Sequence, residues 1–293
     1  MRPLRISLEP AELFLSLVEQ KVDVEEVLAH PAYKVVFSHA KKYGSGLTAE
    51  DVTDALSGNS SKFFGLKHLR QNLTELRRLM RVVERQQEAW LQAATSALTE
   101  VVDASYLDNV WVYPIIGYDT GIGHNGAACM NLNSPKYLSD HKEFLYFVMH
   151  EVFHVVYERI HRIPDLADVN TPDEWVGFVD LFFQNEGYAT YVPLEPRVLA
   201  GDMRDRDYAV LNNPKRVESC ISKYFEVRDA MMGEQLSREQ RMHLGFGPLR
   251  LTYRVGAELA RRIESVYGKD EVRSAIKKSG TEFWESYSHL LKS

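Results

Sequence analysis

The sequence predicts a mainly helical α+β fold with a small mixed sheet and a helical N-terminal region. Three observations predict this class. Apolar residues recur at helical steps through the first third, β-branched and aromatic residues cluster between positions 109 and 133, and helical patterns return beyond position 140. With 293 residues, 45% of them apolar, the chain can bury a sizeable core. We expect a helical region over residues 1–100 and a second region over residues 101–293, or alternatively one continuous domain.

The charge balance and the N-terminal residues narrow the class of protein. A formal net charge of -6 and a pI near 6.0 predict no general affinity for nucleic acid or anionic membranes, which attract a surplus of Lys and Arg. Residues 1–10 contain charges and prolines where a secretory signal needs an unbroken apolar run, so a cytoplasmic protein is expected. No apolar run approaches the roughly 20 residues of a membrane-spanning helix. Cys129 and Cys220 are expected to be free thiols.

The first third carries helical patterns separated by turn residues. A first helix is expected over residues 10–28, a turn at residues 43–46 and a second break at residues 57–61. A long helix is then expected from Leu66 to about Leu98, because its apolar residues recur at steps of three and four. Basic and acidic residues are interspersed along it, as on a solvated helix face, so no nucleic-acid surface is expected there.

Residues 109–133 have the composition of short strands. Residues 111–118 are rich in β-branched and aromatic side chains, and residues 121–126 are rich in glycine. We expect two short strands here, which form a hairpin or a sheet edge and directly precede the next helix.

A helix of about 20 residues is expected to begin near Asp140. Asp140 can cap this helix with Glu143 as its capping-box partner, and no Pro or Gly intervenes before Pro164. The helix contains an H-E-x-x-H motif at residues 150–154.

The H-E-x-x-H motif predicts a zinc site with one ion per chain. His150 and His154 lie one helical turn apart, so both imidazoles can reach one Zn²⁺ at about 2.0 to 2.1 Å. Glu151 stands beside them, where it can act as general base on a water molecule. The alternative is that both histidines lie on a buried face and the glutamate on a solvated one.

A catalytic zinc site normally takes three protein ligands, so a third ligand is expected downstream. The metzincin pattern fails, because it requires Gly and His where this chain has Tyr157 and Ile160. His161 is one residue out of register for that pattern. Glu174 has a local explanation as the capping-box residue of a helix that begins after Thr171.

Glu186 lies further along that helix, on a stripe of apolar residues that begins at Trp175. A carboxylate on a buried stripe is costly unless it is paired or binds a cation, so Glu186 is the predicted third ligand. Pairing with an arginine is the alternative. Gly187 is expected to let this helix closely approach the helix of the two histidines.

Two segments resemble a known family of zinc peptidases. Residues 184–191, Q-N-E-G-Y-A-T-Y, resemble the N-E-G-F-A-T-Y segment that carries the third zinc ligand in the gluzincin aminopeptidases related to leukotriene A4 hydrolase. The resemblance implies a gluzincin-like catalytic domain over residues 101–293, with Glu186 as a metal ligand. Residues 253–258, Y-R-V-G-A-E, are similar to the family's Y-x-x-G-A-E segment, which implies that Tyr253 stabilises the oxyanion. The pattern of the residues alone favours a core aromatic at Tyr253.

The chain also departs from these aminopeptidases. The spacing from His154 to Glu186 is longer, which implies an extra turn or loop near residues 163–171. Residues 126–131 lack the glutamate of the family's G-x-M-E-N strand, which holds the free amine of a substrate. In size the chain looks closest to compact, uncharacterised zinc peptidases with the same layout. Further candidates for oxyanion or substrate contacts are His243, Asn131 and Gly126.

The sequence therefore predicts a zinc metallopeptidase that acts on a peptide or protein. One alternative is a catalytically inert binding or regulatory protein that keeps the peptidase fold. Another is a zinc hydrolase of a different amide or ester. The presence of Glu151 favours an active hydrolase over an inert protein.

Overall fold

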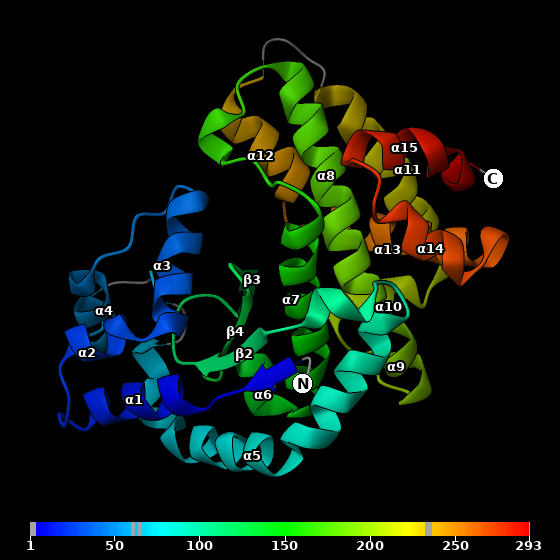
Figure 1. Ribbon diagram of the computed structural model, residues 1–293. Coiled ribbons are helices and arrows are strands. Elements are labelled where there is room, and N and C mark those ends of the chain that lie inside the picture. Colours follow the sequence, from blue (N-terminus) through cyan, green and yellow to red (C-terminus); the bar gives the residue numbers. More distant parts are fainter. Residues whose placement is uncertain (1–3, 60–61, 64–65, 232–235, 293) are drawn as a thin grey trace. The chain divides into compact units, whose positions relative to one another are not determined.

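The computed structural model describes residues 4–59, 62–63, 66–231 and 236–292 of the chain. These residues form a mainly helical α+β protein with one small mixed sheet, which confirms the predicted fold class (Figure 1). Among the described helices, none combines the length and the apolar character needed to cross a membrane. Both cysteines are free thiols, as predicted.

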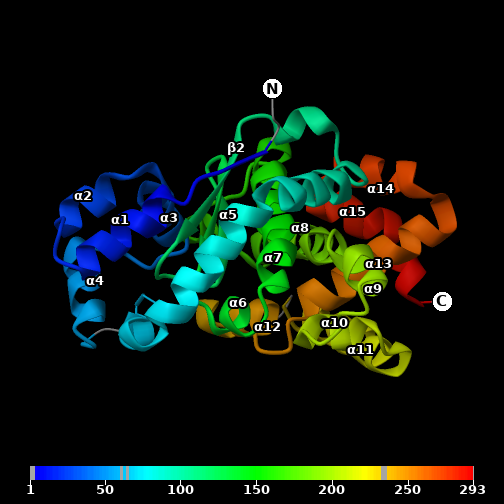
Figure 2. The same cartoon turned by 90° about the horizontal axis from the view of Figure 1, so that it is seen from below.

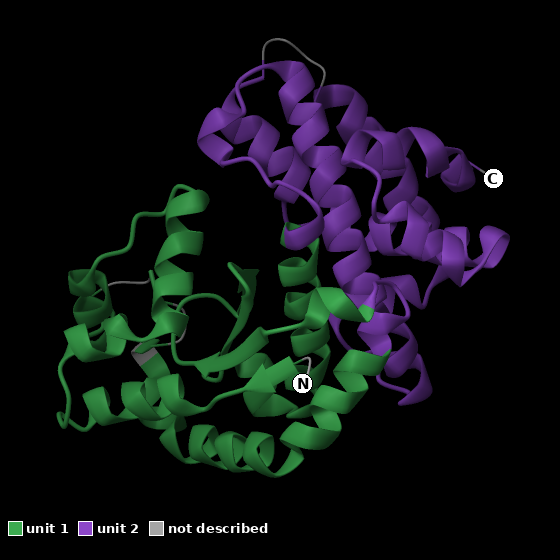
Figure 3. Ribbon diagram, viewed as in Figure 1, with its two compact units in different colours: residues 1–96, 104–158 green, residues 97–103, 159–293 purple. Residues whose placement is uncertain are grey.

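Two compact units divide the chain (Figure 3). Unit 1 contains residues 1–96 and 104–158, and unit 2 contains residues 97–103 and 159–293. Residues 97–103 belong to unit 2, the chain returns to unit 1 at residue 104, and it passes into unit 2 again after Glu158.

Unit 1 contains a four-stranded sheet with the order β1-β2-β4-β3. Its strands are β1 (Leu4–Ile6), β2 (Val110–Ile115), β3 (Gly121–His124) and β4 (Ala127–Asn131). The strands β1, β2 and β4 are parallel, whereas β3 runs antiparallel to β4 and forms an edge. Asn125 and Gly126 join β3 to β4 with φ angles of 48° and 82°, as in the tight turns that fit a hairpin.

The sequence predicted the hairpin but not the whole sheet. Two strands were expected between residues 109 and 133, and the structure has three there. The additional parallel strand β1 is three residues long, too short to give a periodic pattern. The helices α1 and α3 contact the sheet, α1 at β2 and α3 at β3 and β4.

The first predicted helix, over residues 10–28, is wrong as a single element. It is two helices, because Gln20 adopts a φ of 60° and the Asp23 side chain accepts a hydrogen bond from Glu26 N at 2.9 Å to start the second. The helices of this part of the chain are α1 (Glu9–Val18), α2 (Val24–Ala29), α3 (Pro31–Lys42), α4 (Ala49–Leu56), α5 (Leu69–Thr99), α6 (Pro135–Ser139) and α7 (Lys142–Ile160).

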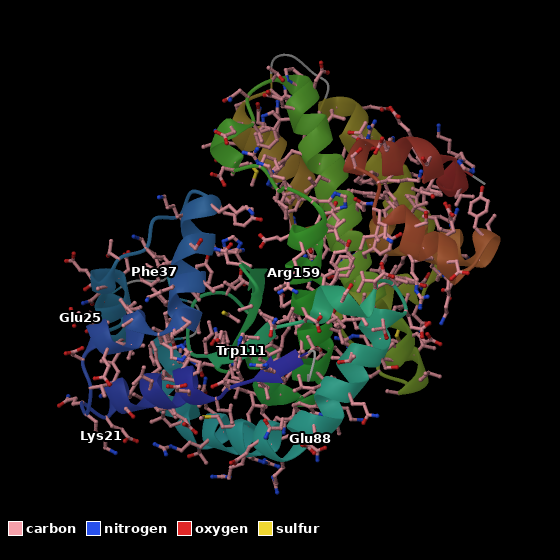
Figure 4. All side chains as sticks on the ribbon, viewed as in Figure 1. Lys21, Glu25, Phe37, Glu88, Trp111 and Arg159 are labelled. Atoms are coloured by element: carbon pink, nitrogen blue, oxygen red, sulfur yellow. The ribbon has the colours of Figure 1, made fainter. Side chains whose placement is uncertain are left out.

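The long helix α5 follows its predicted pattern. Its apolar residues Leu69, Leu76 and Val83 are buried, whereas its charged residues face solvent. Figure 4 shows the labelled Glu88 of α5 as an exposed side chain. Of the predicted break at residues 57–61, Gly58 has a φ of 82°, and residues 60–61 lie outside the described part of the chain.

The described residues of unit 2 form helices joined by short loops and include no strand. The helices α13 and α15 pack against α8 (Figure 2), and nearly every residue of α8 from Phe178 to Thr190 is buried. The helices of unit 2 are α8 (Pro172–Tyr191), α9 (Leu194–Leu199), α10 (Arg206–Leu211), α11 (Pro214–Met231), α12 (Arg238–Phe246), α13 (Leu251–Tyr267), α14 (Lys269–Ala275) and α15 (Gly280–Tyr287).

Candidate metal centre

The helix α7 carries the H-E-x-x-H motif in unit 1. The Asp140 side chain accepts a hydrogen bond from Lys142 N at 3.0 Å, so it satisfies one of the first backbone donors of the helix, as predicted. The part of Glu143 as its capping-box partner stays a prediction. The helix then runs to Ile160 without interruption. The motif therefore lies within regular helix.

The two histidines of the motif face each other on α7. Their rings are nearly perpendicular, and the Nε2 atoms of His150 and His154 are 3.1 Å apart. Two nitrogens bound to one tetrahedral zinc at the usual bond length lie about 3.3 Å apart. The pair thus has the spacing that a shared zinc ion requires, and both side chains are only half-buried.

Glycines of β3 let the edge strand lie directly on this part of α7. A Cβ atom at Gly123 would lie 2.0 Å from the Glu151 carbonyl oxygen and 2.7 Å from the His154 Cβ. A Cβ atom at Gly121 would lie 2.9 Å from the Glu151 carboxylate. Only glycine fits at position 123, where the contact is with the backbone of α7, whereas a side chain at position 121 would require the Glu151 side chain to shift.

A polar network fixes the hairpin turn and α3 to the same helix. Glu158, one turn after the second histidine of the motif, accepts hydrogen bonds from His124 Nδ1 at 2.7 Å, Asn125 N at 2.9 Å and Lys42 Nζ at 3.0 Å. Ser38 Oγ lies 3.0 Å from the other ring nitrogen of His124 and accepts from Asn125 Nδ2 at 3.0 Å. The network holds β3 in position over α7.

One residue of this network, Glu158, and one residue beside it, His39, have strongly shifted pKa values. Burial opposes ionisation of Glu158, but the hydrogen bond and charge of His124, with Asn125 N and Lys42, outweigh it and lower the pKa of Glu158 to about 2. Burial, followed by the charge of His124, lowers the pKa of His39 to about 3. His39 Nδ1 lies 3.0 Å from the Tyr118 hydroxyl, and because its pKa is this low the half-buried imidazole is neutral at neutral pH.

In unit 2, the start of α8 follows the sequence prediction. Thr171 and Glu174 form a capping box, in which the Glu174 carboxylate accepts from Thr171 N and Glu174 N donates to the Thr171 hydroxyl. The hydrogen bonds that the Glu174 carboxylate accepts from Thr171 N and Asn170 N lower its pKa. Glu174 is exposed in the first turn of α8, and its carboxylate caps the N-terminus of this helix.

Glu186 lies deep along α8 and is only 9% exposed. The glycine that follows it, Gly187, packs on Gly256 of α13, where an added Cβ would lie 2.6 Å from backbone atoms. The expectation that Gly187 faces the helix of the histidines was therefore wrong, because the glycine is used for the crossing of α8 and α13. This crossing brings together the two segments that resemble the aminopeptidase family.

Tyr253 is half-buried in the first turn of α13, three residues before Gly256. The guanidinium carbon of Arg250 lies 3.4 Å from the centre of the Tyr253 ring, a close cation–π contact. Arg250 Nε donates to Asp207 at 2.6 Å, and Arg254 Nε donates to the other oxygen of Asp207 at 2.8 Å. No sequence pattern indicated a part for Arg250 at this position.

The remaining candidates occupy three different environments. His243 is exposed in the last turn of α12. Asn131 is fully buried, and its side-chain oxygen accepts from Gly117 N and Asn133 N, so it holds the loop before β3. Gly126 forms the hairpin turn, where its left-handed conformation favours glycine.

Comparison with known proteins identifies the class of this chain. Residues 24–293 match the model of a family described as "putative zinc dependent peptidase (DUF5700)". The chain belongs to this family. No curated protein and no solved structure gives a significant match.

Proposed function

We propose that the protein is a zinc metallopeptidase of the gluzincin type, in which His150, His154 and Glu186 hold one zinc ion. The observation that carries the proposal is the pair of imidazole nitrogens 3.1 Å apart on α7, with Glu151 next to them. The assignment of Glu186 is supported by its buried position in the segment that resembles the family's ligand motif. Membership of the family supports zinc dependence and peptidase activity in general.

Two imidazoles and one carboxylate are a common ligand set for catalytic zinc, which leaves a fourth position open. When bound there, zinc acts as a Lewis acid and lowers the pKa of water. Glu151 is proposed to take the proton of the attacking water and to pass it to the leaving amine. Tyr253 is proposed to donate its hydroxyl hydrogen to the substrate oxygen as negative charge develops.

The edge strand β3 supports a peptide as the substrate. Among the described strands it pairs only with β4, so its other side offers backbone groups to an extended chain. Gly121 and Gly123 bring this strand against the Glu151 turn of α7, so a peptide paired with β3 would run beside the general base. We also propose that the protein acts in the cytoplasm, the location expected from the sequence.

The test is a digest of an unbiased peptide library, followed by mass spectrometry. Zinc-loaded protein should produce a defined set of cleavages that disappears on chelation and returns when zinc is restored. Absence of cleavage by protein with stoichiometric zinc would contradict peptidase activity and favour an inert binding protein. Hydrolysis of ester or non-peptide amide substrates with the library left intact would identify the other type of zinc hydrolase.

A further inference from the structure

Arg250 has a backbone conformation that is unfavourable for arginine. Its φ and ψ are 47° and 45°, in the left-handed region, directly before the first residue of α13. A side chain with a Cβ atom adopts this conformation at a cost that glycine does not incur. Strained residues of this kind concentrate at functional sites.

The guanidinium group of Arg250 is fixed on two sides. Its Nε donates to Asp207 at 2.6 Å, and its plane lies over the ring of Tyr253. Arg254 donates to the same carboxylate of Asp207, so two guanidinium groups share one carboxylate. This cluster of Arg250, Arg254 and Asp207 therefore keeps a surplus positive charge.

The outer nitrogens of Arg250 are available for a ligand. Within the described part of the chain, Nη1 and Nη2 of Arg250 make no hydrogen bond, and its side chain is 31% accessible. An arginine held at Nε presents a planar pair of N–H groups, which matches the two oxygens of a carboxylate. Such a preorganised group binds with less loss of side-chain entropy than a mobile one.

Arg250 stays positively charged at neutral pH. Burial disfavours the charge, but Tyr253, Asp207 and Glu186 outweigh this effect and raise the pKa of Arg250. Two of these neighbours are the proposed oxyanion donor Tyr253 and the proposed zinc ligand Glu186. A ligand bound at Arg250 would thus lie beside the proposed oxyanion donor.

We infer that Arg250 binds a carboxylate of the substrate and selects peptides that carry one close to the cleaved bond. The inference rests on the proposed function, because it takes Tyr253 as a group that contacts the substrate. The carboxylate can be the C-terminus of the peptide or an acidic side chain, since the same pair of N–H groups would recognise either.

Three pools of random hexapeptides with blocked N-termini test the inference. The first has free C-terminal carboxylates and no acidic residues, the second is its C-terminal amide, and the third is an amide with Asp and Glu included. Wild-type protein should cleave a carboxylate-bearing pool about 10- to 100-fold faster than the second, the range expected for a charge-assisted bidentate pair. Preference for the first or the third pool identifies the source of the carboxylate.

Substitutions show whether Arg250 causes this preference. Arg250→Gln should bring the rates for the three pools together, and Arg250→Lys, which keeps the charge but loses the planar pair, should restore part of the preference. Arg261→Gln removes an exposed arginine within α13, the helix that follows Arg250, and should keep the wild-type preference. Equal cleavage of all pools by the wild type, or an equal loss on all pools in Arg250→Gln, would overturn the inference.

A binding measurement decides the matter without turnover. Zinc-free protein is titrated with N-acetylphenylalanine and with its amide, while NMR follows the arginine side-chain N–H signals. The acid should shift one signal that is missing in Arg250→Gln, and the amide should not. No difference between acid and amide would overturn the inference. If the wild type cleaves no pool at all, the proposed function fails, and this titration alone decides whether Arg250 is a carboxylate site.

Discussion

The histidine pair on α7 and the Glu186–Tyr253 region of α8 and α13 are assembled in different ways. In unit 1, one helix supplies both imidazoles, and their 3.1 Å spacing follows from the helical repeat. In unit 2, residues from two helices far apart in sequence come together where Gly187 meets Gly256. The first arrangement is local and the second depends on tertiary packing. Functional geometry of the first kind can be read from a motif, whereas the second kind requires the fold.

Both regions nevertheless use glycine for the same physical purpose. A Cβ at Gly123 would lie 2.0 Å from the backbone of α7, and a Cβ at Gly187 would lie 2.6 Å from the backbone of α13. Contacts this short cannot be relieved by rotating a side chain. We therefore expect both regions to be sensitive to small substitutions that leave every proposed ligand in place.

The largest effect on catalysis is expected at Glu151, which we expect to be required for hydrolysis but not for zinc binding. Glu151→Gln keeps the shape and removes the base, so hydrolysis should fall by at least about 100-fold while zinc content persists. Metal analysis and peptide-cleavage rates on the same preparation measure the two quantities. Loss of zinc in this variant would show that Glu151 is a ligand, and α7 would then have a different arrangement from the one proposed.

The glycine crossing of unit 2 should be the next most sensitive feature. Gly187→Ala forces α8 and α13 apart and should lower the free energy of unfolding by about 1–3 kcal/mol, the usual cost of overpacking. Gly177→Ala is a matched control on the same helix, because its Cβ would meet only Thr281 Oγ1 at 3.9 Å. The control should be neutral or stabilising by up to about 1 kcal/mol. Urea unfolding of both variants measures the difference, and equal stabilities would contradict the close crossing.

A smaller effect concerns pH, because the neutral His39 lies beside His124 of the polar network in unit 1. Its pKa is lowered from 6.5 to about 3, chiefly by burial and then by His124. As the pH falls, the unfolded chain therefore binds a proton at His39 before the folded chain does. The contribution of neutral His39 to the free energy of unfolding is present above pH 6.5 and is lost as the pH falls toward 3. The slope is at most about 1.4 kcal/mol per pH unit.

His39→Gln should remove this part of the slope, whereas replacement of the exposed His243 should retain it. Urea unfolding of zinc-free protein at several pH values between 7 and 4 provides the measurement. Parallel pH profiles for wild type and His39→Gln would mean that the imidazole does not stay neutral in the folded state.

The sequence predicted most where the controlling interactions are local. The Thr171–Glu174 capping box and the uninterrupted helix around the motif depend on neighbouring residues, and both are present in the structure. The first predicted helix failed because the left-handed Gln20 has no pattern that marks it in advance. Gly187 was recognised as a close-approach residue, but its partner could not be predicted without the packing of α8 on α13. The environment of Arg250 likewise depends on Asp207 and Tyr253, which belong to different helices.

The central claim is that Glu186 is the third zinc ligand beside the two histidines of α7. Competitive zinc titration against a chelator tests this claim most directly, because it measures which carboxylate is needed for zinc affinity. Glu186→Ala should weaken zinc binding by more than about 100-fold, since even residues that only support a ligand cost 10- to 100-fold. Glu174→Ala, which removes the exposed capping carboxylate of the same helix, should bind zinc as tightly as the wild type. Retained affinity in Glu186→Ala together with lost affinity in Glu174→Ala would contradict the assignment of the third ligand.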